Sequence, residues 1–170
     1  MHVIAMAGLP GVGKSALAQA LARRLGCAVL DKDVVREELF PGAVDHSAGQ
    51  DDRAMAAIYA RVEEQARGGA SHAVIDGRTF TRRAHVDELR ERVSRMGATL
   101  TLIECVCDPH VARDRIRRDL EAGRHPARNR TPELHDELLR RAEPIEGPKL
   151  VVESTRGDPA VLAASLGLSP

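Results

Sequence analysis

A glycine-rich segment near the N-terminus constrains the fold of this chain more than any other feature. Residues 8–15 read Gly-Leu-Pro-Gly-Val-Gly-Lys-Ser, which matches the pattern G-x-x-x-x-G-K-S. The apolar run before it, residues 2–7, predicts a buried strand. The segment from Lys14 to Leu25 predicts an amphipathic helix, because its leucines recur at four-residue spacing and Gly26 follows as a helix end. A strand, a tight turn and a helix in this order form the structural context that the pattern requires.

The residue types of this segment suit a polyphosphate ligand. Glycines let the main chain turn tightly and bring its N–H groups onto phosphate oxygens. The helix that begins near Lys14 adds the positive end of its dipole. We expect Lys14 to reach the β- and γ-phosphates of ATP, and Ser15 to be a magnesium ligand. The predicted nucleotide-binding residues are Gly8, Pro10, Gly11, Val12, Gly13, Lys14, Ser15 and Ala16.

Strand-like and helix-like segments alternate along the rest of the chain. This order predicts an α/β fold, a P-loop NTPase with a five-stranded parallel sheet and helices on both faces. We expect one domain, residues 1–170, with irregular segments at 41–52 and 121–131. Asp108-Pro109, Thr131-Pro132 and Asp158-Pro159 each predict a helix start. The predicted strands are residues 2–7, 27–31, 73–75, 99–107 and 149–153, and the predicted helices include 14–25, 33–40, 81–96 and 159–167.

Composition limits the partners and the environment of the protein. The 25 basic and 25 acidic residues give a formal net charge of zero, so no basic surface for nucleic acid or membrane is indicated. Aromatic residues make up 2% of the chain, which disfavours base stacking. Three cysteines predict no disulfide framework, and we expect Cys105 and Cys107 to be buried in opposite layers. No leader or membrane-spanning run is evident in the sequence, so we expect a cytoplasmic protein.

An aspartate closes the third predicted strand. Val74 and Ile75 lead into Asp76, which is placed next to the P-loop strand and is therefore predicted as a ligand of magnesium or of its water. Gly77 follows it, where motor ATPases carry a glutamate that activates water. The Asn-Lys-x-Asp segment that reads guanine is missing from the sequence. Both differences favour a kinase over a motor ATPase or a switch GTPase.

The second predicted strand ends in a cluster of charged residues. Because the carboxyl ends of parallel strands face the ligand crevice, Asp31 or Asp33 is expected to point toward the γ-phosphate. Either carboxylate could accept the proton of an attacking hydroxyl. Arg36 lies three residues after Asp33, on the same face of a helix. The alternatives are that Asp33 only caps that helix and that Asp31 is a solvated loop acid.

Arginines are concentrated late in the chain. Residues 113–130 contain seven arginines and three acids, and we expect a lid at about 118–132 that closes over the triphosphate. Arg113 and Arg117 share one helix face, whereas Arg115 and Arg118 are expected to be solvated. The catalytic arginine of the lid is predicted among Arg124, Arg128 and Arg130, and we assign it to Arg128.

Together these motifs resemble the zeta-toxin-like P-loop kinases, a group that includes chloramphenicol phosphotransferase and the kinase domain of phage polynucleotide kinase. The resemblance rests on the P-loop, on residues 31–36, on residues 74–79 and on the arginine-rich segment. It implies the strand order 2-3-1-4-5, Asp33 as general base and Arg36 as a contact to substrate or phosphate. It also implies that Arg113 or Arg117 lies against adenine, bordered by Arg156 in the turn 155–157.

The leading hypothesis is an ATP- and Mg²⁺-dependent kinase that transfers the γ-phosphate to a hydroxyl group of a small molecule. A polynucleotide 5′-hydroxyl kinase is a second hypothesis, which the neutral charge and scarce aromatic residues disfavour. A third is a nucleotide-binding regulatory ATPase without a dedicated acceptor.

Overall fold

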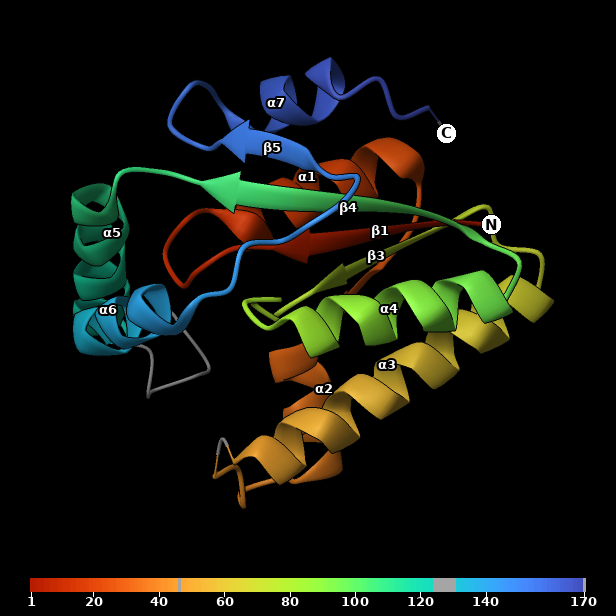
Figure 1. The fold of residues 1–170 in the computed structure, drawn as a ribbon, viewed down its shortest axis with the longest axis horizontal. Coiled ribbons are helices and arrows are strands. Elements are labelled where there is room, and N and C mark those ends of the chain that lie inside the picture. The colour runs from red at the N-terminus through yellow and green to blue at the C-terminus, as the bar shows by residue number, and fades with distance from the viewer. Residues whose placement is uncertain (46, 124–130, 170) are drawn as a thin grey trace.

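The computed structural model describes residues 1–45, 47–123 and 131–169. Its centre is a parallel sheet of five strands in the order β2-β3-β1-β4-β5, so the predicted fold class and strand order are confirmed (Figure 1). The strands are β1 (His2–Ala7), β2 (Val29–Asp31), β3 (His72–Asp76), β4 (Thr99–Val106) and β5 (Leu150–Glu153). Every neighbouring pair in the sheet is parallel, as the connecting helices require.

Helices cover both faces of the sheet (Figure 1). They are α1 (Lys14–Leu25), α2 (Lys32–Leu39), α3 (Ala48–Arg67), α4 (Arg83–Arg95), α5 (Pro109–Glu121), α6 (Pro132–Arg141) and α7 (Pro159–Ser165). Val3 and Ala5 of β1 face a core that α3 and α4 complete, whereas Ile4 and Met6 face a second core against α1. Side chains of a strand alternate between its two faces, so a strand that is buried on both sides is mainly apolar, as β1 is from Val3 to Ala7.

Side-chain caps set several helix boundaries. The hydroxyl or carboxylate of Asp108, Thr131 and Asp158 accepts a main-chain N–H at the start of its helix, with proline at the first or second helical position, which confirms the three predicted starts. Helix α3 begins at Ala48, inside the stretch 41–52 that was expected to be irregular. Its helix start is stabilised by Ser47 Oγ, which accepts the N–H of Gln50 at 3.3 Å.

The prediction for Cys105 in β4 and Cys107 just after it is wrong in one respect. Cys105 is fully buried and Cys107 is half-buried, but both pack against the core that contains Ile4 and Met6. Residues two apart in an extended segment point to the same side, so the two thiols share a layer. Burial raises the pKa of the Cys105 thiol to about 12, which favours the unreactive thiol. Within the described residues, no helix has the length and apolar character needed to cross a membrane.

Candidate active site

The P-loop connects β1 to α1, and its glycines are required by neighbouring main chain. Gly8 has a φ of +126°, and a Cβ there would lie 2.3 Å from the carbonyl oxygen of Cys105. Gly11 has a φ of +79°, and a Cβ there would lie 2.5 Å from the carbonyl oxygen of Ala112. Both positions therefore exclude any side chain, both by conformation and by space. The P-loop is held against the end of β4 and the start of α5.

The start of α1 has the properties of an anion site. Gly13 is its N-cap and offers no side-chain acceptor, and no acidic residue lies in the first turn. The first main-chain N–H groups of a helix have no partner inside the helix, and the helix dipole makes this end positive. The Lys14 ammonium group is buried and donates to the carbonyl of Leu9 at 2.8 Å. This cradle fits the phosphates of a nucleotide.

A cavity of about 400 Å³ opens beside the helix start. Gly13, Lys14, Ser15 and Ala16 form one wall, Arg115 and Asp119 of α5 form another, and Ser154 and Gly157 from the turn after β5 complete it. A volume of this size lies within the range of small-molecule sites. Because the phosphate cradle forms one end, the remaining space is suited to the nucleoside.

The arginines of α5 are placed differently from the sequence predictions. Arg115 donates to the carbonyl of Gly11 at 3.4 Å and to Ser154 Oγ at 3.0 Å, so the expectation that it is a solvated surface residue is wrong. Arg113 pairs instead with Asp136 at 2.9 Å. Arg117 is exposed and pairs with Asp114 of its own helix at 2.6 Å. The structure therefore brings Arg115, and neither Arg113 nor Arg117, to the cavity wall.

The remaining predicted arginines have three different outcomes. Arg118 is exposed, as expected. Arg156 is exposed on the turn after β5 and does not line the cavity, although Ser154 and Gly157 of the same turn do. Arg128 lies outside the described residues, together with the central part of the predicted lid at 118–132.

Asp76 is the most unusual polar residue of the site. Its side chain is fully buried at the end of β3, and neither carboxylate oxygen has a hydrogen-bond partner among the described residues. A buried carboxylate without a partner is costly, so the chemistry of this position fits a bound cation or an ordered water. Together with the hydroxyl of Ser15 on the cavity wall, Asp76 fits a site for Mg²⁺, which prefers oxygen ligands and keeps several waters.

Asp31 lies opposite Asp76, at the end of the neighbouring strand β2. It is the N-cap of α2, and its carboxylate accepts the N–H groups of Asp33 at 2.7 Å and Val34 at 3.4 Å. Asp33 itself lies in the first turn, so the alternatives in which Asp33 only caps the helix and Asp31 is a solvated acid are both wrong. Burial raises the pKa of Asp31 above its usual value, and the nearby Asp76 raises it further.

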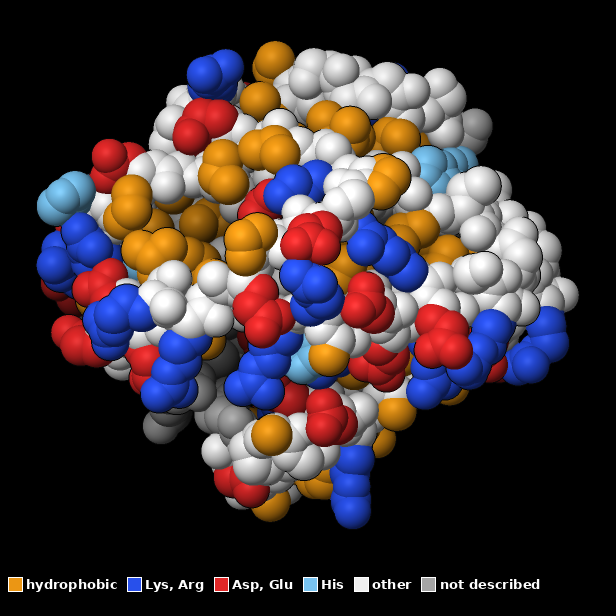
Figure 2. Space-filling view, viewed as in Figure 1, with side chains coloured by type: hydrophobic (Ala, Val, Ile, Leu, Met, Phe, Trp, Pro, Cys, Tyr) orange, Lys and Arg blue, Asp and Glu red, His pale blue; other side chains and the backbone are white. Residues whose placement is uncertain are grey.

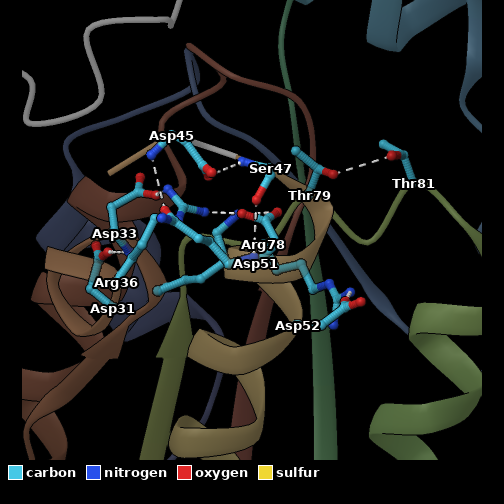
Figure 3. Close-up of polar contacts among 12 residues, drawn as sticks. Asp31, Asp33, Arg36, Asp45, Ser47, Asp51, Asp52, Arg78, Thr79 and Thr81 are labelled. Atoms are coloured by element: carbon cyan, nitrogen blue, oxygen red, sulfur yellow. Dashed lines mark hydrogen bonds and ion pairs between the residues drawn. The ribbon is translucent and has the colours of Figure 1, made fainter. Parts of the chain in front are cut away.

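Asp33 belongs to a compact network of charges. Its carboxylate accepts a hydrogen bond from Arg36 at 2.9 Å, which confirms the predicted proximity of these two residues. Arg36 also pairs with Asp51 of α3, and Lys32 pairs with the same Asp51 at 2.8 Å. The side chain of Arg36 is 3% exposed and that of Asp33 is 10% exposed. Figure 3 shows Asp33, Arg36 and Asp51 converging at the ends of α2 and α3. We call Lys32, Asp33, Arg36 and Asp51 the charge quartet.

Two of these functional candidates were missed in the sequence. Asp51 lies in the stretch expected to be irregular, and nothing near it in the sequence indicates that α3 brings it to Arg36. Arg115 carried a detectable signal. Ala112 and Ile116 form the buried stripe of α5, and Arg115 is adjacent to that stripe on the helical wheel.

The AAA domain family designated AAA_33 matches residues 3–145. No curated protein matches the chain. A protein from Chloroflexus aurantiacus that is assigned as a kinase is 24% identical, with a TM-score of 0.76, over 97% of this chain and 96% of that chain.

Two further solved structures have the same fold. Kti12 from Chaetomium thermophilum, in complex with ADP-AlF3, is 16% identical with a TM-score of 0.71, over 96% of each chain. A gluconokinase from Sinorhizobium meliloti 1021 is 18% identical with a TM-score of 0.64, over 97% of this chain and 93% of that chain. The family match includes the P-loop, both strand-end aspartates and α5. The chain therefore belongs to the AAA_33 family and has the α/β P-loop NTPase fold that it shares with P-loop kinases.

Proposed function

We propose that the protein is an ATP-dependent phosphotransferase that moves the γ-phosphate to a hydroxyl group of a small molecule. The observation that carries the proposal is the position of Asp76. This buried, unpartnered carboxylate lies one strand from the P-loop, where a nucleotide-bound cation would satisfy it. The residues that would hold Mg²⁺ are Ser15 and Asp76, and the ion would neutralise charge on the phosphate oxygens. The kinase relatives support this assignment at the level of the fold.

The P-loop residues would bind and orient the triphosphate. The N–H groups from Gly11 to Ala16 would donate to phosphate oxygens, and Lys14 would exchange its bond to the Leu9 carbonyl for the β- and γ-phosphates. Arg115 would border the nucleoside from α5, in the role that the resemblance to zeta-toxin-like kinases implied for Arg113 or Arg117. Positioning of this kind provides much of the catalysis in phosphoryl transfer.

Asp33 is proposed as the general base. It would accept the proton of the acceptor hydroxyl as that oxygen attacks the γ-phosphate. Arg36 holds Asp33 in place at 2.9 Å and is itself held by Asp51, so the base is fixed by two helices. Gly77 leaves no carboxylate directly after Asp76 to activate water, which favours transfer to a hydroxyl over hydrolysis. The narrower resemblance to zeta-toxin-like kinases, and a lid at about 118–132 that supplies Arg128, are part of this proposal.

A small acceptor is favoured over a polynucleotide. The chain has three aromatic residues, and the rings of Tyr59 and Phe80 are fully buried. Phe40, the third, is covered in part by the guanidinium of Arg53, 6.0 Å from its ring centre. Single-stranded nucleic acids are often bound by stacking of their bases on exposed aromatic rings, and this chain offers little exposed aromatic surface for such stacking.

The test is release of ADP from Mg-ATP in the presence of a panel of small hydroxyl compounds. At least one compound should stimulate release. With that compound, Asp33→Asn should lower turnover by about 10²–10⁴-fold and leave nucleotide affinity unchanged. Glu37→Gln, an exposed acid on the same helix, is the matched control and should keep full activity. Full activity of Asp33→Asn would contradict the base assignment.

Other outcomes separate the alternatives. Tight ATP binding with no stimulation by any compound would favour a regulatory ATPase. Incorporation of labelled phosphate into a 5′-hydroxyl oligonucleotide would favour the polynucleotide kinase. Absence of any nucleotide binding would overturn the proposal.

A further inference from the structure

A second cavity lies on the opposite side of the P-loop from the cavity of about 400 Å³ beside the start of α1, which we call the nucleotide cavity. Its volume is about 210 Å³, and it shares no wall residue with the larger cavity. Its walls come from the first part of the P-loop, the loop after β3, the end of β4, α6 and the segment that follows α6. Representative wall residues are Leu9, Phe80, Val106, His135, Leu139 and Ile145.

The surface around this cavity is apolar. Figure 2 shows hydrophobic side chains gathered around a hollow near the end of β4, on the left of the view. Leu139, which forms part of the wall, is 45% exposed. Exposed apolar surface that surrounds a hollow is a common mark of a binding site. A dry cavity of about 150 Å³ is large enough for benzene, so this one suits a compact molecule of about eight non-hydrogen atoms.

Most polar side chains of the wall already have partners. The Glu104 carboxylate pairs with Lys149 at 2.6 Å, and the Glu143 carboxylate accepts the N–H of Arg83. The hydroxyl groups of Thr79 and Thr81 lie 3.1 Å apart and point toward each other in Figure 3. The two carboxylates are therefore engaged, and they do not call for a cationic ligand.

His135 is the exception. Its side chain belongs to the cavity wall and is 1% exposed, and its Nε2 has no hydrogen-bond partner among the described residues. Its Nδ1 lies 2.8 Å from the carbonyl oxygen of Pro10. A carbonyl can only accept, so Nδ1 carries the proton, and in the neutral ring Nε2 is left as an acceptor. A buried acceptor without a partner is costly, and a donor from a ligand would remove that cost.

We propose that this cavity is a second ligand site, which takes a compact, mainly apolar alcohol or phenol whose hydroxyl donates to His135 Nε2. The site is separate from the nucleotide cavity and does not depend on the proposed phosphotransfer. Because His135 also holds Pro10 of the P-loop, the ligand would contact the same structural element as the nucleotide from its other side.

The test uses benzyl alcohol and toluene, which differ by the hydroxyl group, and measures binding to the whole chain by NMR titration. Benzyl alcohol should bind saturably with a Kd of about 1 mM. Toluene should bind about fivefold more weakly, which is the usual net effect of one hydrogen bond. His135→Phe keeps a ring of similar size and should remove this difference. Equal binding of the two compounds to the unmodified chain would overturn recognition of the hydroxyl.

Two matched variants locate the site. Leu139→Trp fills the cavity from an exposed position and should weaken the binding of benzyl alcohol at least tenfold. Leu120→Trp makes the same change at a leucine of similar exposure on α5, outside the cavity, and should have no effect. Binding should persist with AMPPNP present. Absence of saturable binding, loss of binding with AMPPNP, or unchanged binding in Leu139→Trp would each overturn the proposal. None of these results bears on nucleotide binding itself, which is measured separately in the same variants.

Discussion

Asp51→Asn tests whether the charge quartet is a structural unit. Asp51 pairs with both Lys32 and Arg36, and its replacement by Asn changes the formal charge of the quartet from zero to +1. Removing one partner of a buried ion pair costs about 3–5 kcal/mol, whereas an exposed pair contributes about 0–1 kcal/mol. The side chain of Asp51 is 31% exposed but that of Arg36 is 3% exposed, so the cost of removing this pair should lie between the values for buried and exposed pairs. We expect the free energy of unfolding to fall by about 2 kcal/mol.

The next residue provides the control. Asp52→Asn makes the same chemical change on the same helix, but the Asp52 side chain is 71% exposed. Its partner Arg78 would still pair with the Glu88 carboxylate at 3.5 Å. The substitution should cost about 0.5 kcal/mol or less. Urea unfolding of the two variants measures the difference, which should be about 1.5 kcal/mol.

Acceptor-dependent turnover is a second measurement on the same pair of variants. Misplacement of Arg36 should displace Asp33, so Asp51→Asn should lower kcat by about tenfold or more, with nucleotide affinity unchanged. Equal losses of stability in Asp51→Asn and Asp52→Asn would refute the reasoning. So would a stable Asp51→Asn variant with full turnover.

Three further predictions concern the P-loop, the metal site and pH. Gly11→Ala should abolish nucleotide binding and cost at least about 2 kcal/mol more in urea unfolding than Gly26→Ala, because a Cβ at Gly26 meets nothing within 4 Å whereas at Gly11 it meets the Ala112 carbonyl. Asp76→Asn should raise the Tm without ligand, because a buried unpaired charge is removed, yet abolish the further Tm rise with Mg-AMPPNP; a normal rise would contradict the metal assignment. Burial, followed by Arg78 and Arg82, lowers the pKa of His85 to about 4, so the stability that this residue contributes is complete above pH 6.5 and is lost as the pH falls toward 4. Since His85 is only partly buried, the loss should be about 1 kcal/mol, and His85→Gln should show a smaller decrease over the same pH range in urea unfolding.

The predictions from sequence that held depend on short segments of chain. The P-loop is eight consecutive residues, and its glycine pattern has few uses other than wrapping the main chain around phosphate. The pairing of Asp33 with Arg36 needs only one helical turn, and the caps at Asp108, Thr131 and Asp158 act on the helices that follow them.

Contacts between segments that are distant in the sequence could not be predicted in this way. Asp51 meets Arg36 because α3 packs across α2, and Arg115 meets Ser154 because α5 and the turn after β5 both border the P-loop. Spacing placed Arg113 and Arg117 on one helix face and the resemblance assigned that face to adenine, but which face of α5 meets the P-loop depends on how the helix packs.

The amino-acid sequence by itself determined the parallel sheet, the phosphate cradle and the acid–arginine pair on α2, because hydrophobic period, glycine pattern and helical spacing are local properties. Only the tertiary structure decided that Asp51 completes the charge quartet and that Arg115 lines the cavity beside the start of α1. The tertiary structure also formed the second cavity, whose walls come from four separate stretches of the chain. The physical reason is that side-chain contacts between remote segments follow from the packing of whole helices and strands, which no short stretch of residues encodes.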